Sequence, residues 1–253
     1  MNKVVVAISF LIMIFVNAIA NIIPLNGYTT GEVSDLYKNL FAPDAITFEI
    51  WGLIYILLAI YVVYQLFFNK KNSYIDLYEK IGFYFTLSCI ANSAWIFLWH
   101  FLQIGFSFIF MLVLLFCLIA IYTIIDAASI NLKHKTLLKI PFSVYLGWIT
   151  VATIANAAAF IVSLGWNAFS ITSIFITVIV LFVGILIASI IILKNNDIAY
   201  GLVIIWAYSG ILIKHISSDG FAGEYPVIIA ATILSIIMLN ISVVYVIMNK
   251  IRK

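Results

Sequence analysis

Long apolar runs alternate with short polar connections along the whole chain. A membrane-crossing helix needs about 20 mostly apolar residues, because the hydrocarbon core of a bilayer is about 30 Å thick. The shortest run, 198–216, ends in Lys214 and His215. The pattern predicts an all-α membrane protein, a polytopic bundle of about eight transmembrane helices. The runs lie at about 3–24, 46–68, 81–101, 104–126, 140–164, 169–193, 198–216 and 226–248.

The composition of the chain also indicates a membrane protein. Of the 253 residues, 66% are hydrophobic and 9% are charged, whereas soluble domains are about 45–50% apolar and about 25% charged. The net charge of +3 is too small to indicate nucleic-acid binding. Cys89 and Cys117 lie inside apolar runs, which favours buried free thiols over a disulfide or a zinc site.

The distribution of basic residues predicts the orientation, because cytoplasmic loops are enriched in Lys and Arg. With eight spans and a cytoplasmic N-terminus, only Lys38 and Lys214 of the 13 basic residues lie outside. We therefore expect a multi-pass protein of the cell membrane with both termini in the cytoplasm. Ala18-Ile19-Ala20 mimics a signal-peptide cleavage site, but we treat the first run as a retained helix. The cytoplasmic basic residues are Lys3, Lys70, Lys71, Lys80, Lys133, Lys135, Lys139, Lys194, Lys250, Arg252 and Lys253.

The first external loop, about 25–45, is the long connection of the chain. It is polar and rich in turn-forming residues, and long loops of this kind often act as lids over a site. A plain extracellular connection is the alternative, and the sequence leaves both open.

One tripeptide, Ile-Ala-Asn, recurs in the first, third and fifth spans and ends at Asn21, Asn92 and Asn156. An amide within hydrocarbon must find hydrogen-bond partners. We therefore expect all three to face the bundle interior, either joining helices to one another or lining a ligand cavity.

Aromatic residues gather at the same membrane level. Trp51 and Tyr55 open the second span, Trp95 lies in the third, and Trp148 precedes Asn156 by two turns. Interfacial belts explain Trp and Tyr near helix ends, but Trp95 and Trp148 lie deeper. Flat rings around a few amides would suit a large planar apolar ligand.

Ionisable residues are nearly absent from the spans. Glu49 and Asp126 lie near helix ends, which argues against a proton-coupled pump or a transporter of charged substrates. Lys214 lacks the deep carboxylate that a retinal Schiff base needs, so a snorkelling lysine is the better interpretation. His100 and His215 lie at the outer rim, and two lone histidines do not by themselves make a haem site.

Three motifs resemble the TspO/MBR family of tryptophan-rich sensory proteins and translocator proteins. The fifth span carries Pro141 and then Trp148-Ile149-Thr150-Val151-Ala152-Thr153-Ile154-Ala155-Asn156, similar to the family's Pro followed by Trp-x-x-x-Ala-Thr-x-x-Asn. The third carries Asn92-Ser93-Ala94-Trp95 for Asn-x-x-Trp, and the second Trp51-Gly52-Leu53-Ile54-Tyr55 for Trp-x-x-x-Tyr.

The resemblance covers residues 1–165 and implies a five-helix core, with 166–253 as a three-helix extension that has no counterpart in short members. It implies a loop-covered cavity for porphyrins, sterols and synthetic aromatic ligands. Two departures stand out: Phe48 lies one residue closer to Trp51 than is usual, and Ala158-Ala159-Phe160 replace the Trp-Arg that commonly follows the asparagine of the fifth span. The implied ligand-binding residues are Trp51, Tyr55, Asn92, Trp95, Trp148, Ala152 and Asn156.

These observations lead to one main functional hypothesis, a receptor, sensor or carrier for a hydrophobic planar ligand such as a tetrapyrrole. No cofactor is required, and porphyrin or haem enters as a ligand. A membrane transporter of a lipid-like or neutral solute is the alternative. An enzyme ranks last because the sequence offers no nucleophile–base pair and no metal-ligand cluster. Short family members usually dimerise, so a homodimer stays open.

Overall fold

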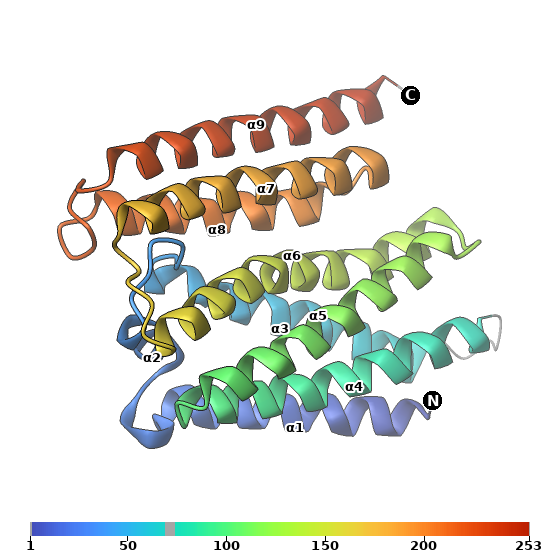
Figure 1. The fold of residues 1–253 in the computed structure, drawn as a ribbon. Helices are drawn as coiled ribbons and strands as arrows, with labels where there is room; N and C mark the ends of the chain where they lie inside the picture. Colours follow the sequence, from blue (N-terminus) through green and yellow to red (C-terminus); the bar gives the residue numbers. More distant parts are fainter. Residues whose placement is uncertain (1, 69–73, 253) are drawn as a thin grey trace. The chain divides into compact units, whose positions relative to one another are not determined.

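The computed structural model describes residues 2–68 and 74–252, and within these ranges it is helical, without strands. Nine α-helices are joined by two 3₁₀ turns, η1 (Leu25–Gly27) and η2 (Ala45–Glu49), and by one π-helical segment, η3 (Tyr64–Phe68). Figure 1 shows their order along the chain. The α-helices are α1 (Lys3–Ile22), α2 (Thr30–Leu36), α3 (Ile50–Val63), α4 (Ile75–His100), α5 (Ile104–Ala127), α6 (Leu132–Ser163), α7 (Ile171–Asn195), α8 (Ile198–Ile216) and α9 (Pro226–Ile251).

Eight helical segments of the described chain are long and apolar enough to span a membrane, which confirms the predicted bundle. Two begin earlier than the apolar runs indicated: α4 at Ile75 and α6 at Leu132. Their first turns are polar, and a search for apolar residues cannot recognise them. In α6 the helix also continues through Pro141, which transmembrane helices tolerate better than soluble ones. Lys70, Lys71 and Lys253, used above to predict orientation, lie outside the described residues.

The chain forms two compact units, unit 1 (Met1–Val33 and Ile50–Ile149) and unit 2 (Ser34–Glu49 and Thr150–Lys253). The first loop and α6 are therefore each divided between the units. This division differs from a boundary at residue 165. The interpretation of 1–165 as a family-like core and 166–253 as an extension stays a prediction.

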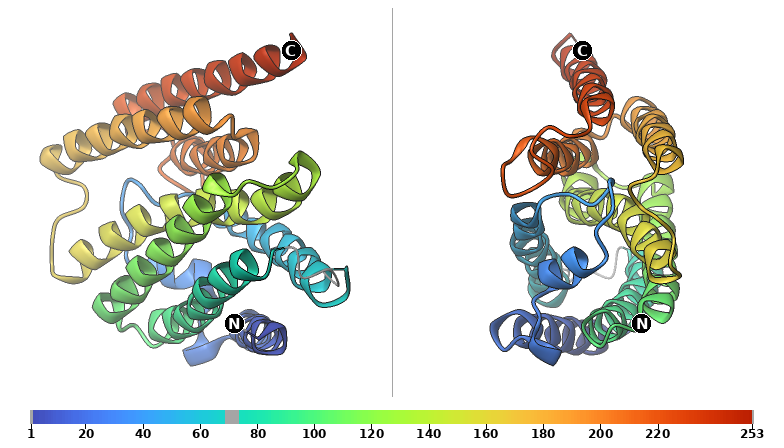
Figure 2. Two further views of the ribbon diagram at one scale, coloured as in Figure 1. Left: turned by 90° about the vertical axis from the view of Figure 1, so that its right-hand side faces the viewer. Right: turned by 60° about the vertical axis from the view of Figure 1, so that its left-hand side comes forward.

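Unit 1 packs α4 between α1 and α5, and the three helices lie side by side in Figures 1 and 2. Its core is aromatic: the ring of Tyr61 lies edge-on to Phe142 at 4.9 Å and to Phe85 at 5.3 Å between centroids. At the start of α6, each ring nitrogen of His134 forms one hydrogen bond to a tyrosine hydroxyl. Nδ1 bonds to Tyr64 at 2.9 Å, and Nε2 bonds to Tyr78 at 2.7 Å. This Tyr–His–Tyr arrangement joins the π-helical end of the second span to α4 and α6.

Unit 2 packs α9 against both α7 and α8 (Figure 1). The α7–α8 connection is tight because Asn196 adopts the left-handed conformation (φ 49°) and Asp197 caps α8 by accepting from the Tyr200 amide. Gly201 lets the helices approach closely: a Cβ there would lie 2.7 Å from Val243 and 2.9 Å from Ile192. Small residues at such contacts are typical of helix packing in membranes.

Candidate functional site

Trp51 stands at the centre of an aromatic cluster in unit 1. Its ring is stacked with those of Tyr55 and Trp95, at 5.5 and 5.9 Å between centroids and at 25° and 29° between planes. Tyr145 and Trp148 meet it edge-on at 5.8 and 6.3 Å. Trp95 and Trp148 are buried, whereas Trp51 is partly exposed. The structure thus brings together the four aromatic residues that the sequence analysis selected, and adds Tyr145.

Asn92 lies beside this cluster and links three helices. Its Oδ1 accepts from Asn17 of α1 at 2.6 Å, and its Nδ2 donates to the hydroxyl of Tyr145 in α6 at 3.1 Å. All three side chains are buried. This geometry is that of an amide joining helices, and it uses both ends of the Asn92 side chain.

The indole of Trp95 differs from this amide. Its Nε1 is buried and donates no hydrogen bond within the described part of the chain. Indole N–H groups usually find a partner when buried. The cluster therefore contains one donor that a bound ligand could use.

Two of the seven predicted residues belong to unit 2. Ala152 and Asn156 follow the point in α6 at which unit 2 begins. Asn156 is buried, and its Oδ1 accepts no hydrogen bond from any described residue, whereas Ala152 is partly exposed. Asn156 is thus an interior amide, as expected, with an acceptor that remains available.

The expectation that Asn21 faces the interior was wrong. Asn21 is exposed; its Nδ2 donates to the Asn17 carbonyl at 3.0 Å, and its Oδ1 accepts from Thr30 at 3.1 Å. It lies in the last turn of α1, where the returning loop is its neighbour. The buried amide of α1 is Asn17, one turn earlier, which is not part of the repeated tripeptide.

The part of the first loop that belongs to unit 1 is attached to the end of α4. The hydroxyl of Thr30 bonds to Nε2 of His100 at 3.1 Å, and Trp99 donates from Nε1 to the Thr30 carbonyl at 3.0 Å. Asn26 donates to the carbonyl of His100 at 3.1 Å. His100 therefore orders a loop segment through the nitrogen that a haem iron would need.

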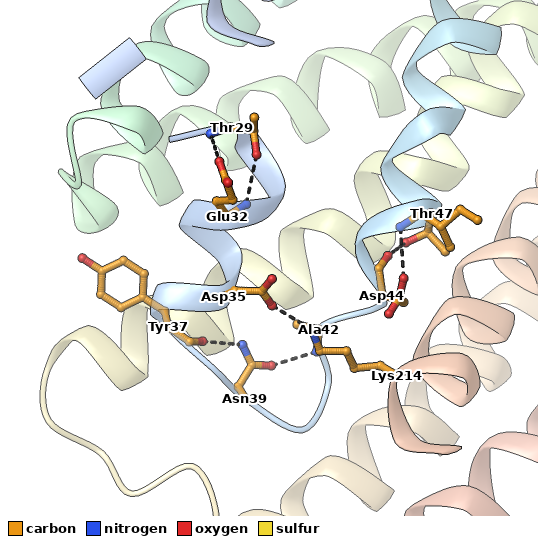
Figure 3. Close-up of polar contacts among 10 residues, drawn as sticks. Thr29, Glu32, Asp35, Tyr37, Asn39, Ala42, Asp44, Thr47 and Lys214 are labelled. Carbon is orange, nitrogen blue, oxygen red and sulfur yellow. Dashed lines mark hydrogen bonds and ion pairs between the residues drawn. The ribbon is translucent and has the colours of Figure 1, made fainter. Parts of the chain in front are cut away.

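The part that belongs to unit 2, residues 34–49, is attached to α8. Lys214 forms an ion pair with Asp35 at 2.7 Å, which Figure 3 shows. His215 Nε2 bonds to the Leu40 carbonyl at 2.9 Å. Lys214 thus reaches a loop carboxylate, a partner that the pattern of the sequence does not indicate.

Further along the same segment, the backbone itself is bonded to α8. Trp206 donates from Nε1 to the Thr47 carbonyl at 3.1 Å, and the amide of Asp44 donates to the Gly210 carbonyl at 3.0 Å. A Cβ at Gly210 would meet the side chain of Thr47 and lie 3.1 Å from Pro43. Figure 3 shows the local turns at Asn39 and Asp44 that shape this segment.

The chemistry that these side chains offer is non-covalent. Among the described residues, no group of three or more His, Cys, Asp or Glu side chains could hold a metal ion. Cys89 and Cys117 are buried free thiols, as predicted. The cluster supplies ring faces, amides and an indole donor, which are suited to binding.

A family model described as TSPO-like protein matches residues 3–245. No curated protein and no solved structure matches the chain significantly. The match extends beyond residue 165 to residue 245, so α7, α8 and most of α9 belong to the family pattern as well. With eight helices in its described part that are long and apolar enough to span a membrane, and a family match over residues 3–245, the chain is a multi-pass membrane protein of the TSPO-like family.

Proposed function

We propose that this protein binds a hydrophobic planar ligand, a tetrapyrrole of the porphyrin type, without covalent chemistry. The observation that carries the proposal is the arrangement around Trp51, where two rings stack nearly parallel to it and two more meet it edge-on. A flat apolar molecule gains most from such ring faces.

The ligand would enter by replacing contacts that the rings now make with one another. Trp51 and Tyr55 are the partly exposed members, and the ring of Trp51 stacks with those of Tyr55 and Trp95. If the Trp51 side chain turned aside, a planar molecule could occupy the space on the ring of Trp95. The available Nε1 of Trp95 could then donate to a ligand carboxylate or ring nitrogen.

Titration with protoporphyrin IX, followed by tryptophan fluorescence of the purified protein, tests the proposal. We expect saturable quenching that weakens at least tenfold in apparent affinity in Trp51→Phe and Trp95→Phe, and less in Trp148→Phe. Trp166→Phe is the matched control, because Trp166 lies outside the cluster and should leave the affinity unchanged. Non-saturable quenching, or equal affinities in all four variants, would contradict the proposal.

A transporter of a lipid-like or neutral solute remains the second candidate function. The observation that favours it is the buried Asn156, whose free acceptor suits a neutral hydrogen-bonding solute in unit 2. Uptake of labelled ligand into proteoliposomes separates the two candidates, since a receptor binds without translocating.

We also propose that both termini lie in the cytoplasm and that the protein belongs to the cell membrane. The support is the excess of Lys and Arg in the connections assigned to that side. A cysteine introduced at Asp219 should react with a membrane-impermeant maleimide in intact cells, and one introduced at Asn2 should react only after lysis. The reverse pattern would invert the topology.

A further inference from the structure

Unit 2 contains a cavity of about 260 Å³ that is built from residues outside the aromatic cluster. It lies where α6 ends at Ser163 and α7 begins at Ile171, with one wall formed by the first loop. Leu40, Phe41 and Ala168 are buried and form its inner wall. Ile161, Trp166 and Ile176, at its mouth, are 47–49% exposed.

The polar groups that line the cavity are already engaged. Asn39 donates to the Tyr37 carbonyl and accepts from the amides of Phe41 and Ala42. Ser173 accepts from Nε1 of Trp166 at 3.0 Å and donates to the Asn167 carbonyl at 2.7 Å. Thr177 donates to the Ser173 carbonyl. No charged side chain lines the cavity, so nothing in it calls for a polar or ionic occupant.

The position of the mouth identifies the source of the occupant. Both α6 and α7 span the membrane, and the α7 surface that follows the mouth is apolar and exposed at Phe175, Ile179 and Phe182. Such a surface faces acyl chains. Trp166 lies between the two spans, at the level where tryptophans mark the membrane interface. With Trp166 at the membrane interface, the mouth would open to lipid just below the head groups.

The volume limits the size of the occupant. Sites for drug-sized molecules measure about 300–1,000 Å³, so this cavity lies below that range and is too small for a tetrapyrrole. It is lined mainly by apolar side chains, which suits a flexible apolar occupant that enters from the bilayer. We propose that the cavity is a binding site for part of one acyl chain of a membrane phospholipid, with the head group held at the level of Trp166.

Occupancy would support the first loop as well. Leu40 and Phe41 form the inner wall, and the Leu40 carbonyl accepts from His215 of α8. An acyl chain packed on these two side chains excludes water from that loop contact. The bound lipid is thus a structural part of unit 2, and this role goes beyond the ligand proposed for the aromatic cluster.

Native mass spectrometry of the full chain tests the site, with palmitoyl-oleoyl phosphatidylcholine as the probe after delipidation in detergent. Ala158 lines the cavity and Ala157, its neighbour in α6, does not. We expect the natural chain and Ala157→Leu to retain one lipid, and Ala158→Leu to retain at least tenfold less. Equal retention in all three proteins, or no lipid on the natural chain, would overturn the proposal.

A second measurement does not depend on how Ala158→Leu folds. Phosphatidylcholine brominated in its acyl chain quenches nearby indoles, and the difference between the natural chain and Trp166→Phe isolates Trp166. We expect this component to saturate at one lipid per protein. A component that grows continuously with lipid content would show only the surrounding bilayer and would overturn the proposal.

Discussion

The two units use their polar side chains differently. In unit 1 the buried amides are bonded side chain to side chain, from Asn17 through Asn92 to Tyr145. In unit 2 three long donors of α8 end on backbone carbonyls, Trp206 on Thr47, Tyr208 on Leu181 and His215 on Leu40, while Tyr200 and Lys214 donate to side chains. Removing one member of a side-chain network leaves several partners unsatisfied, whereas removing a donor to a backbone carbonyl affects that one acceptor. We therefore expect substitutions in the first network to be strongly coupled and those in unit 2 to act one at a time.

Asn92→Ala should have the largest effect. It removes the acceptor of Asn17 and the donor to Tyr145, and leaves both buried. We expect a loss of about 2–3 kcal/mol in the free energy of unfolding, measured by SDS denaturation in mixed micelles.

Asn21→Ala is the matched control for this substitution, because Asn21 ends the same tripeptide but is exposed. Its loss should stay below about 1 kcal/mol. The double variant Asn92→Ala/Tyr145→Phe should lose less free energy of unfolding than the sum of the losses of its two single variants. Equal losses at positions 21 and 92 would remove the contrast between a buried network and an exposed amide.

Gly210→Ala should cause the second-largest loss in the free energy of unfolding. The added methyl group would collide with Thr47 and press on Pro43, and the backbone bond between Asp44 and Gly210 would lengthen. Overpacking of this kind costs about 1–3 kcal/mol, measured as above. Gly52→Ala is the control: nothing lies within 4 Å of a Cβ at Gly52, and alanine there should be neutral or slightly stabilising. A harmless Gly210→Ala would mean that the loop does not need this close contact with α8.

The aromatic cluster of unit 1 and the loop contacts of α8 in unit 2 differ in how far they could be predicted from the sequence. The eight spans followed from apolar length alone, and the cluster around Trp51 followed from aromatic residues, depth and motif. Asn17 is also an amide in an apolar run, but the repeated tripeptide indicates Asn21 instead. The contacts of α8 could not be predicted, because a carbonyl acceptor such as that of Thr47 or Leu40 has no residue signature. Only the folded chain brings Gly210 to Pro43.

The ion pair between Lys214 and Asp35 should contribute less. Lys214 is mostly covered, whereas the carboxylate of Asp35 is 47% exposed and remains hydrated. A double-mutant cycle with Lys214→Met and Asp35→Asn should give a coupling of about 0.5 kcal/mol, decreasing with added salt. The coupling is obtained from the same unfolding measurements, made at about 50 mM and at about 500 mM salt. The higher concentration shortens the Debye length and so screens the ion pair more strongly. A coupling energy that does not change with salt would show that the ion pair is shielded from solvent, and would contradict this prediction.

The smallest effect should come from Glu32 in unit 1, where α2 begins. Its carboxylate accepts from the Thr29 amide at 2.6 Å, and its own amide donates to the Thr29 hydroxyl, which together form a capping box. The bond from the Thr29 amide, and secondarily the bond involving its side chain, lower the pKa of Glu32 below its ordinary value of 4.5. Because the folded state has the lower pKa, the charged carboxylate stabilises the loop fully above pH 4.5, and this contribution disappears as the pH falls through the folded pKa.

Glu32→Gln isolates the charge, since glutamine can still accept from the Thr29 amide. Amide hydrogen exchange in the first turn of α2 should be faster in the variant near neutral pH. The ratio of protection factors between the natural chain and the variant should approach one as the pH falls below 4.5. A ratio that stays constant with pH would show that only the hydrogen bond matters, and that the charge of Glu32 does not help to hold the loop of unit 1.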